Sequence, residues 1–136
     1  MTKMIFVNLP VTDLTASTRF YEAIGCTKNQ DFSDGQSSMM VWTDAISFML
    51  LAHEKFEGFS AKPIAGSGVS EVLLALSCDS REDVGTITQA AAVNGGKADI
   101  RDPQDMGFLF SRAFEDPDGH VFEAVWMDPA AIKGNG

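Results

Sequence analysis

The chain has 136 residues, of which 45% are hydrophobic and 21% charged, and these proportions are typical of a soluble globular protein with one ordinary core. Its formal net charge of −9 repels phosphate backbones, so we expect no nucleic-acid partner. No uninterrupted run of about 18 apolar residues occurs, which argues against a membrane span. The N-terminal apolar segment turns polar at Asn8 and has no small-residue cleavage site, so we expect a cytoplasmic protein.

In chain order, the first half predicts a strand followed by a helix. Apolar residues dominate from Met4 to Pro10 and alternate as in a half-buried strand. Thr12 or Asp13 can cap the next helix by accepting backbone N–H groups. Gly25 supplies the left-handed residue with which helices commonly end.

Three strand-like runs follow in this half. The first two are separated by Asp34-Gly35, a pair typical of two-residue hairpin turns. Asp44 is a weaker boundary between the second and the third. The three runs are Cys26 to Ser33, Gln36 to Thr43 and Ala45 to Ala52.

The second half predicts the same order of elements. An apolar strand runs from Glu71 to Cys78, and Ser80 is a good cap for the helix that follows. Asn94-Gly95-Gly96 ends this helix, and Asp116-Pro117-Asp118-Gly119 predicts a tight turn between the last two strands. The strand-like runs after the helix are Lys97 to Arg101, Gly107 to Glu115 and His120 to Met127.

The repeated order indicates duplication of one supersecondary unit. We therefore predict an α+β fold made of two tandem βαβββ modules, residues 1–52 and 70–128, which together form a single domain over residues 1–128. Residues 53–69 are rich in Gly, Ser, Lys and Glu and are interpreted as a linker. Residues 129–136 are expected to form a flexible tail.

Two stretches at opposite ends of this pattern resemble one family. They are Val7-Asn8-Leu9-Pro10-Val11-Thr12-Asp13-Leu14, followed by Phe20-Tyr21 and Gly25, and Phe114-Glu115-Asp116-Pro117-Asp118-Gly119-His120-Val121-Phe122-Glu123. The chain is similar over nearly its whole length to vicinal oxygen chelate proteins, which include glyoxalase I, bleomycin-resistance proteins and extradiol dioxygenases. It looks closest to bacterial proteins labelled as predicted lactoylglutathione lyases. The resemblance implies a half-open barrel around a small-molecule cavity, and usually a homodimer.

The resemblance also implies four metal-ligand positions. Carried over residue by residue, they fall on Phe6, on Met49 with Ser47 two residues away, on Leu73 and on Glu123. Phenyl and isobutyl groups donate nothing to a metal, and a thioether is too soft for magnesium or manganese. Only Glu123 matches, so we expect no cofactor and consider a divalent metal disfavoured.

Alternation along strands then identifies the side chains that share a face with these positions. Glu123 is the candidate general base, because a carboxylate in an apolar cavity has its charged form disfavoured. The alternative interpretations are that backbone N–H groups hold Glu123 for the fold alone, that Asn8 only secures a strand end, and that Glu71 faces solvent. The expected substrate-binding residues are Phe6, Asn8, Ser47, Met49, Glu71 and Leu73.

Three functions stay open from the sequence. The first is a glyoxalase-type lyase or isomerase that acts on a small carbonyl compound, with Glu123 as its base. The second is a metal-independent small-molecule binding protein of the bleomycin-resistance type. The third is an interaction role in which bulky side chains at the former ligand positions fill the cavity.

Overall fold

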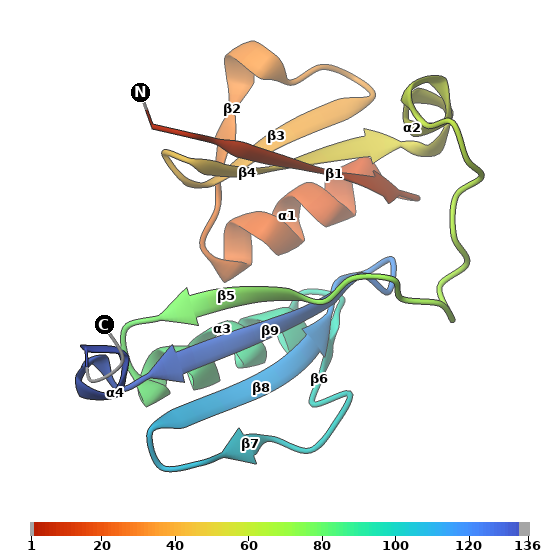
Figure 1. Cartoon of the computed structure of the whole chain (residues 1–136). Helices are drawn as coiled ribbons and strands as arrows, with labels where there is room; N and C mark the ends of the chain where they lie inside the picture. The colour runs from red at the N-terminus through yellow and green to blue at the C-terminus, as the bar shows by residue number, and fades with distance from the viewer. Residues whose placement is uncertain (1, 134–136) are drawn as a thin grey trace. The chain divides into compact units, whose positions relative to one another are not determined.

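The computed structural model describes residues 2–133, and side chains for residues 2–131. The chain divides between Val69 and Ser70 into two compact units, each containing one open sheet with a helix on one face (Figure 1). Within residues 2–133, no helix is long and apolar enough to cross a bilayer. The predicted α+β fold of two βαβββ modules is confirmed.

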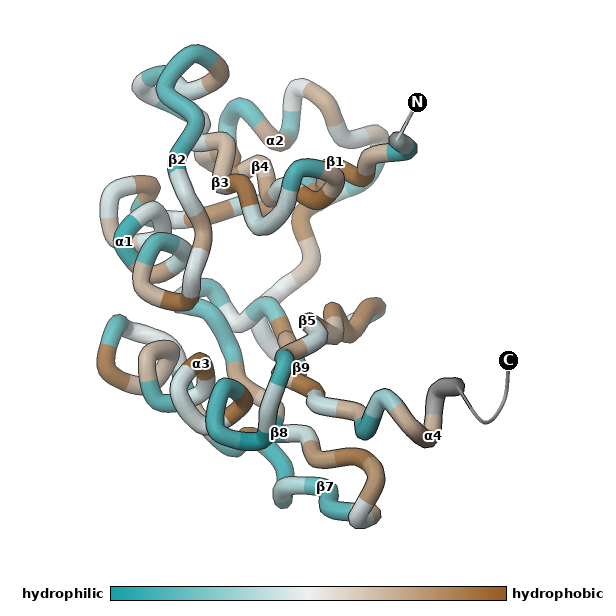
Figure 2. Tube along the Cα trace, turned by 90° about the vertical axis from the view of Figure 1, so that its left-hand side faces the viewer, coloured by the Kyte–Doolittle hydropathy of each residue, from teal (hydrophilic) through white to brown (hydrophobic). Residues whose placement is uncertain are grey.

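The first unit begins with strand, helix and strand in the predicted order. Its sheet has the order β1-β4-β3-β2, with β1 parallel to β4 and the other neighbours antiparallel. Figure 2 shows hydrophobic stretches along β1, β3 and β4, whereas the chain near β2 is hydrophilic. Its elements are β1 (Ile5–Val11), α1 (Leu14–Ile24), β2 (Thr27–Asn29), the 3-10 turn η1 (Gln30–Phe32), β3 (Ser37–Thr43), β4 (Ile46–Ala52) and α2 (His53–Phe59).

The second unit repeats this topology with one small addition. The sheet order β5-β9-β8-β6 matches that of the first unit, and the short strand β7 also pairs with β8. β5 is parallel to β9, as β1 is to β4. Its elements are β5 (Leu74–Cys78), α3 (Arg81–Val93), β6 (Lys97–Ala98), β7 (Gln104–Asp105), β8 (Leu109–Glu115), β9 (Val121–Met127) and α4 (Pro129–Lys133).

The helix α1 covers one face of the first sheet. The Tyr21 ring lies 5.6 Å from the Phe48 ring, and the hydroxyls of Thr18 and Ser38 are 2.9 Å apart. Because successive strand residues point to opposite faces, these contacts assign every second residue of β3 and β4 to the helix side. The buried core of this unit lies there: Leu9, Val11, Phe20, Tyr21, Ile24, Met40, Phe48 and Leu50.

The predicted helix boundaries are confirmed at both ends of α1 and at the start of α3. The Asp13 carboxylate accepts the N–H of Ala16, and the Ser80 hydroxyl accepts the N–H of Asp83. Gly25 ends α1 with φ at +124°. These caps satisfy backbone groups that would otherwise lack partners at the helix ends.

The predicted strand from Cys26 to Ser33 is wrong beyond Asn29. The Asn29 side chain accepts the N–H of Asp31, and the Ser33 hydroxyl donates to the Asn29 carbonyl, so the chain turns into η1. Asp34 and Gly35 therefore lie within a longer connection to β3 and do not form a two-residue hairpin. Local side-chain bonds of this kind compete with the strand ladder.

Three other boundaries differ from the prediction. The predicted linker begins with the helix α2, which follows β4 without a break. The expected tail begins with α4, while residues 134–136 of that tail lie outside the described residues. The strand expected from Glu71 starts only at Leu74.

Gly25 provides a test of the first unit. A Cβ at this position would lie 3.1 Å from the Trp42 ring, and the positive φ disfavours any side chain. We expect Gly25→Ala to lower the free energy of unfolding by about 1–3 kcal/mol. Urea denaturation measures this loss.

The matched control is Gly58→Ala in α2, where an added Cβ would meet nothing within 4 Å. There we expect no loss, and a gain of up to about 1 kcal/mol, because glycine is the more flexible residue in the unfolded chain. Equal losses in the two variants would contradict this account of Gly25.

An arginine clamp secures the outer part of the second unit. Arg81 donates to both carboxylate oxygens of Asp105, at 3.0 and 2.9 Å, and to the carbonyl of Gly107. Its guanidinium carbon also lies 5.2 Å from the centre of the Phe110 ring and 5.1 Å from that of Trp126. The clamp thereby ties β7 to β8 and β9 through charge and ring contacts.

The clamp predicts a pH dependence. The hydrogen bonds from Arg81 lower the pKa of Asp105 from 3.8 to about 2. A lowered folded-state pKa gives stability that is present above pH 3.8 and is lost as the pH falls toward 2. We expect Asp105→Asn to flatten the fall of unfolding free energy over this interval, measured by urea denaturation at each pH. An unchanged slope would contradict the role of the clamp.

Candidate functional site

The face of the first sheet opposite α1 carries four of the residues that the sequence analysis predicts around a cavity. Phe6 pairs with Ser47, and Asn8 with Met49, across the parallel strands β1 and β4. Met39 of β3 pairs with Met49 from the other side. We call this surface the open face of the first unit.

A pocket of about 530 Å³ lies on the open face. This volume is within the range of small-molecule sites. We call it the open-face pocket. A second hollow of about 510 Å³ shares Asn8, Leu51 and Phe59 with it and adds Phe56 and Ser60. The pocket is lined by Asn8, Asp31, Phe32, Ser33, Asp34, Ser37, Met49, Leu51, Lys55 and Phe59.

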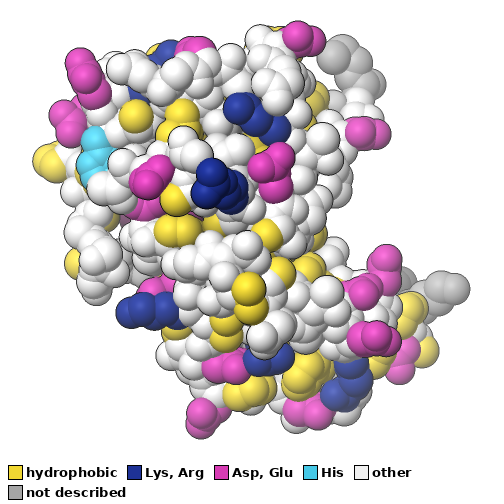
Figure 3. Space-filling view, turned by 180° about the vertical axis from the view of Figure 1, so that it is seen from behind, with side chains coloured by type: hydrophobic (Ala, Val, Ile, Leu, Met, Phe, Trp, Pro, Cys, Tyr) yellow, Lys and Arg dark blue, Asp and Glu magenta, His cyan; other side chains and the backbone are white. Residues whose placement is uncertain are grey.

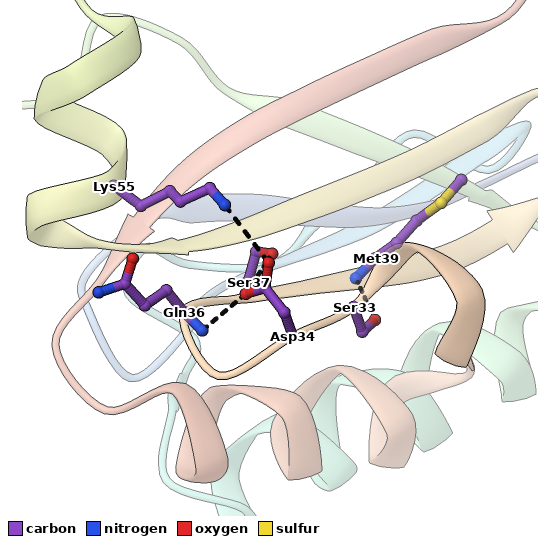
Figure 4. Close-up of polar contacts among 6 residues, drawn as sticks. All are labelled: Ser33, Asp34, Gln36, Ser37, Met39 and Lys55. Carbon is purple, nitrogen blue, oxygen red and sulfur yellow. Dashed lines mark hydrogen bonds and ion pairs between the residues drawn. The ribbon is translucent and has the colours of Figure 1, made fainter.

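The first sheet and two segments beside it build this pocket. The floor comes from β1, β3 and β4, and the rims come from the η1 connection and from α2. A polar network joins the two rims, because the Lys55 ammonium of α2 reaches the Asp34 carboxylate at 3.4 Å (Figure 4). Asp34 also accepts the N–H of Gln36 at 2.8 Å and the Ser37 hydroxyl at 3.0 Å. These hydrogen bonds, the one from Gln36 first, lower the pKa of Asp34.

The pocket joins some of the predicted residues and leaves others apart. Asn8 and Met49 line it, while Phe6 and Ser47 lie on the same face but not among its lining residues. Glu71 and Leu73 precede β5 and are exposed, Leu73 by 61%. Neither residue lies on a strand, so strand alternation does not place them on one face with the other predicted binding residues.

The sequence analysis missed the contribution of α2. Phe56 and Phe59 are spaced three residues apart, as on one side of a helix, and this spacing was a usable signal. The abundance of Gly, Ser, Lys and Glu in residues 53–69 obscured it. Lys55 and the two phenylalanines bring the predicted linker into the site.

Glu123 lies on the face of the second sheet opposite α3. The rings of Phe114 and Phe122 stack in the core at 5.5 Å on the helix side, so Glu123 points the other way. Its carboxylate forms an ion pair with the Arg101 guanidinium. Arg101 also lies 3.5 Å from the Ser111 hydroxyl. No sequence signal pointed to Arg101, because it reaches Glu123 from the irregular chain after β6.

The donor set does not fit the metal that the resemblance implies. Phe6, Met49 and Leu73 offer no hard ligand, and the Glu123 carboxylate already has a cationic partner. Across residues 2–133, no three His, Cys, Asp or Glu side chains gather in a way that could hold a metal ion. We therefore derive no chemical step through a metal.

The cysteines do not offer a nucleophile in its place. Burial raises the pKa of the Cys26 thiol to about 12, so this thiol stays protonated near neutral pH. Desolvation, with a smaller effect of the nearby Asp83 carboxylate, also raises the pKa of Cys78. Thiolate chemistry is therefore disfavoured at both positions.

The Arg101–Glu123 pair can be tested by a double-mutant cycle. The two side chains are 31% and 23% exposed, so solvent screens their attraction only in part. We expect Arg101→Met and Glu123→Gln to show a coupling of roughly 1 kcal/mol in unfolding free energy. The same cycle on Lys55 and Asp34, a more exposed pair, should give less than about 0.5 kcal/mol. Equal couplings would contradict the partial burial of the first pair.

Comparisons with known proteins agree with this geometry. The family model described as Glyoxalase/Bleomycin resistance protein/Dioxygenase superfamily matches residues 3–124. A search of curated protein sequences gave no significant match. Solved structures with the same fold include a hypothetical protein from S. aureus, with 23% identity, a TM-score of 0.77 and coverage of 93% of this chain and 94% of that one.

Two further structures extend the comparison. A glyoxalase/bleomycin resistance protein/dioxygenase family enzyme from Burkholderia phytofirmans is 20% identical, with a TM-score of 0.75 and coverage of 93% of this chain and 99% of that one. The fosfomycin resistance protein FosX from Mesorhizobium loti is 16% identical, with a TM-score of 0.68 and coverage of 98% of both chains. At these identities the structures show the fold alone. The match of the family model over most of the chain shows that the chain belongs to the glyoxalase/bleomycin resistance protein/dioxygenase superfamily.

Proposed function

We propose that this protein binds a small organic molecule in the open-face pocket without the help of a metal. The observation that carries the proposal is the pocket itself, whose lining combines phenyl, thioether and isobutyl groups with amide, hydroxyl and charged side chains. Met49, one of the carried-over ligand positions, lines this pocket and offers apolar contact in place of coordination. The pocket also argues against a face filled by its own side chains.

A lactoylglutathione-lyase-like reaction is the alternative, and it has less support. It requires Glu123 to take a proton from the substrate, but the Glu123 carboxylate is bound to Arg101. The carboxylate would have to leave this guanidinium before it could reach a substrate proton. The described residues also supply no Lewis acid for an enolate.

A homodimer and a cytoplasmic location belong to the same proposal. β1 and β5 are edge strands, and the chain leaves large apolar side chains exposed at Ile5, Val72 and Leu73. Unpaired strand edges with apolar side chains are suited to pairing with another chain. Light scattering at several concentrations measures the molar mass. The cytoplasmic location stays a prediction from the sequence.

The binding function predicts that small apolar molecules raise the melting temperature in the presence of EDTA, because a ligand that binds the native state stabilises it. Phe59 lines the pocket and is 75% exposed, so Phe59→Ala should leave the unliganded stability unchanged. We expect this variant to weaken binding about fivefold, measured by calorimetry. The control is Phe108→Ala, an exposed phenylalanine of the second unit.

Two results would contradict this proposal. One is a screen in which no compound raises the melting temperature. The other is turnover of methylglyoxal with glutathione that disappears in Glu123→Gln, which would favour the lyase instead.

A further inference from the structure

The two carboxylates of the open-face pocket differ in their hydrogen-bond and ion-pair partners. Asp34 is held by Gln36, Ser37 and Lys55, so its carboxylate and the Lys55 ammonium largely serve each other and the fold. Asp31 differs, because its backbone is fixed by the Asn29 side chain at 3.0 Å while no residue of the described chain bonds or pairs with its carboxylate. The pocket therefore presents one unengaged negative charge on an anchored backbone.

Two exposed aromatic rings lie at the rims of the same pocket. Phe32 of η1 is 67% exposed and Phe59 of α2 is 75% exposed, although both line the hollow. The faces of phenyl rings carry partial negative charge and attract cations. Flat apolar groups also gain by covering such rings, since this removes apolar surface from water.

An anionic ligand would be poorly matched to this site. It would approach two carboxylates, Asp31 and Asp34, and the single ammonium of Lys55 is already paired with the second. The protein as a whole carries a formal net charge of −9, and acidic side chains are spread over the face seen in Figure 3. This field repels anions and attracts cations before they bind.

We propose that the ligand of the open-face pocket is an organic cation with a flat apolar ring system, with Asp31 as its counter-charge and Phe32 and Phe59 as its ring contacts. This inference rests on the proposed binding function and adds the charge of the ligand to it. On the floor of the pocket, the ligand would contact Met49 and Leu51, which offer an apolar and adaptable surface.

The test compares three fluorescent probes that share one ring system. They are 9-aminoacridine, which is cationic at neutral pH, acridine, which is neutral, and acridine-9-carboxylate, which carries a negative group. We expect 9-aminoacridine to bind most tightly, and Asp31→Asn to weaken it about fivefold while acridine is unaffected. Phe59→Ala should weaken both. Added salt should reduce the preference for the cation.

The control for charge is Asp44→Asn, an exposed acid in the turn between β3 and β4, at the other end of β3 from Ser37. It should weaken the binding of 9-aminoacridine much less than Asp31→Asn does. Any loss in Asp44→Asn measures the general attraction of the acidic protein for cations, which the loss of any carboxylate lowers.

The outcomes distinguish a failure of the cation preference from a failure of the binding pocket. The preference for a cation is overturned if the three probes bind equally, or if Asp31→Asn and Asp44→Asn lower the affinity for 9-aminoacridine to the same extent. The binding pocket still stands in that case, provided Phe59→Ala weakens binding of the probes. If no probe binds, or Phe59→Ala changes nothing for any of them, the pocket is overturned together with the cation. Chemical-shift changes on Asn8 and Met49 upon titration would place a bound probe in the pocket.

Discussion

The structure depends on a difference between the two faces of each sheet, of which only one is covered by a helix. One face buries its side chains under a helix, through contacts such as Tyr21 on Phe48 in the first unit and the stacked Phe114 and Phe122 below α3 in the second. Because strand side chains alternate strictly, commitment of one face to the core releases the other from it. The open-face pocket of the first unit and the Arg101–Glu123 pair of the second both lie on the face opposite the helix.

The open-face pocket illustrates how that freedom is used. A flat sheet surface alone gives a ligand little contact. The depth of the pocket comes from two segments beside the sheet, the turn η1 and the helix α2. Asn29 turns the chain out of β2, and the Asp34–Lys55 contact joins the two rims. Exposed ion pairs of this kind contribute little stability, so positioning is the more important effect here.

In the second unit, the sheet face opposite α3 carries Glu123, the one residue that matches a ligand position implied by the resemblance. The Arg101 guanidinium forms an ion pair with its carboxylate. A carboxylate that is bound to a guanidinium must give up this partner before it can serve as a ligand or as a base. This requirement counts against the role that the resemblance implies for Glu123.

The sequence by itself determined the βαβββ order of each unit, the helix ends at Asp13, Gly25 and Ser80, and the common strand face of Asn8 and Met49. These features follow from periodicity and from local capping, which act over a few residues. The tertiary structure alone decided that α2 lines the pocket and that Arg101 meets Glu123. Both depend on where irregular segments return in space, and contacts between residues more than twenty positions apart leave no periodic trace in the sequence.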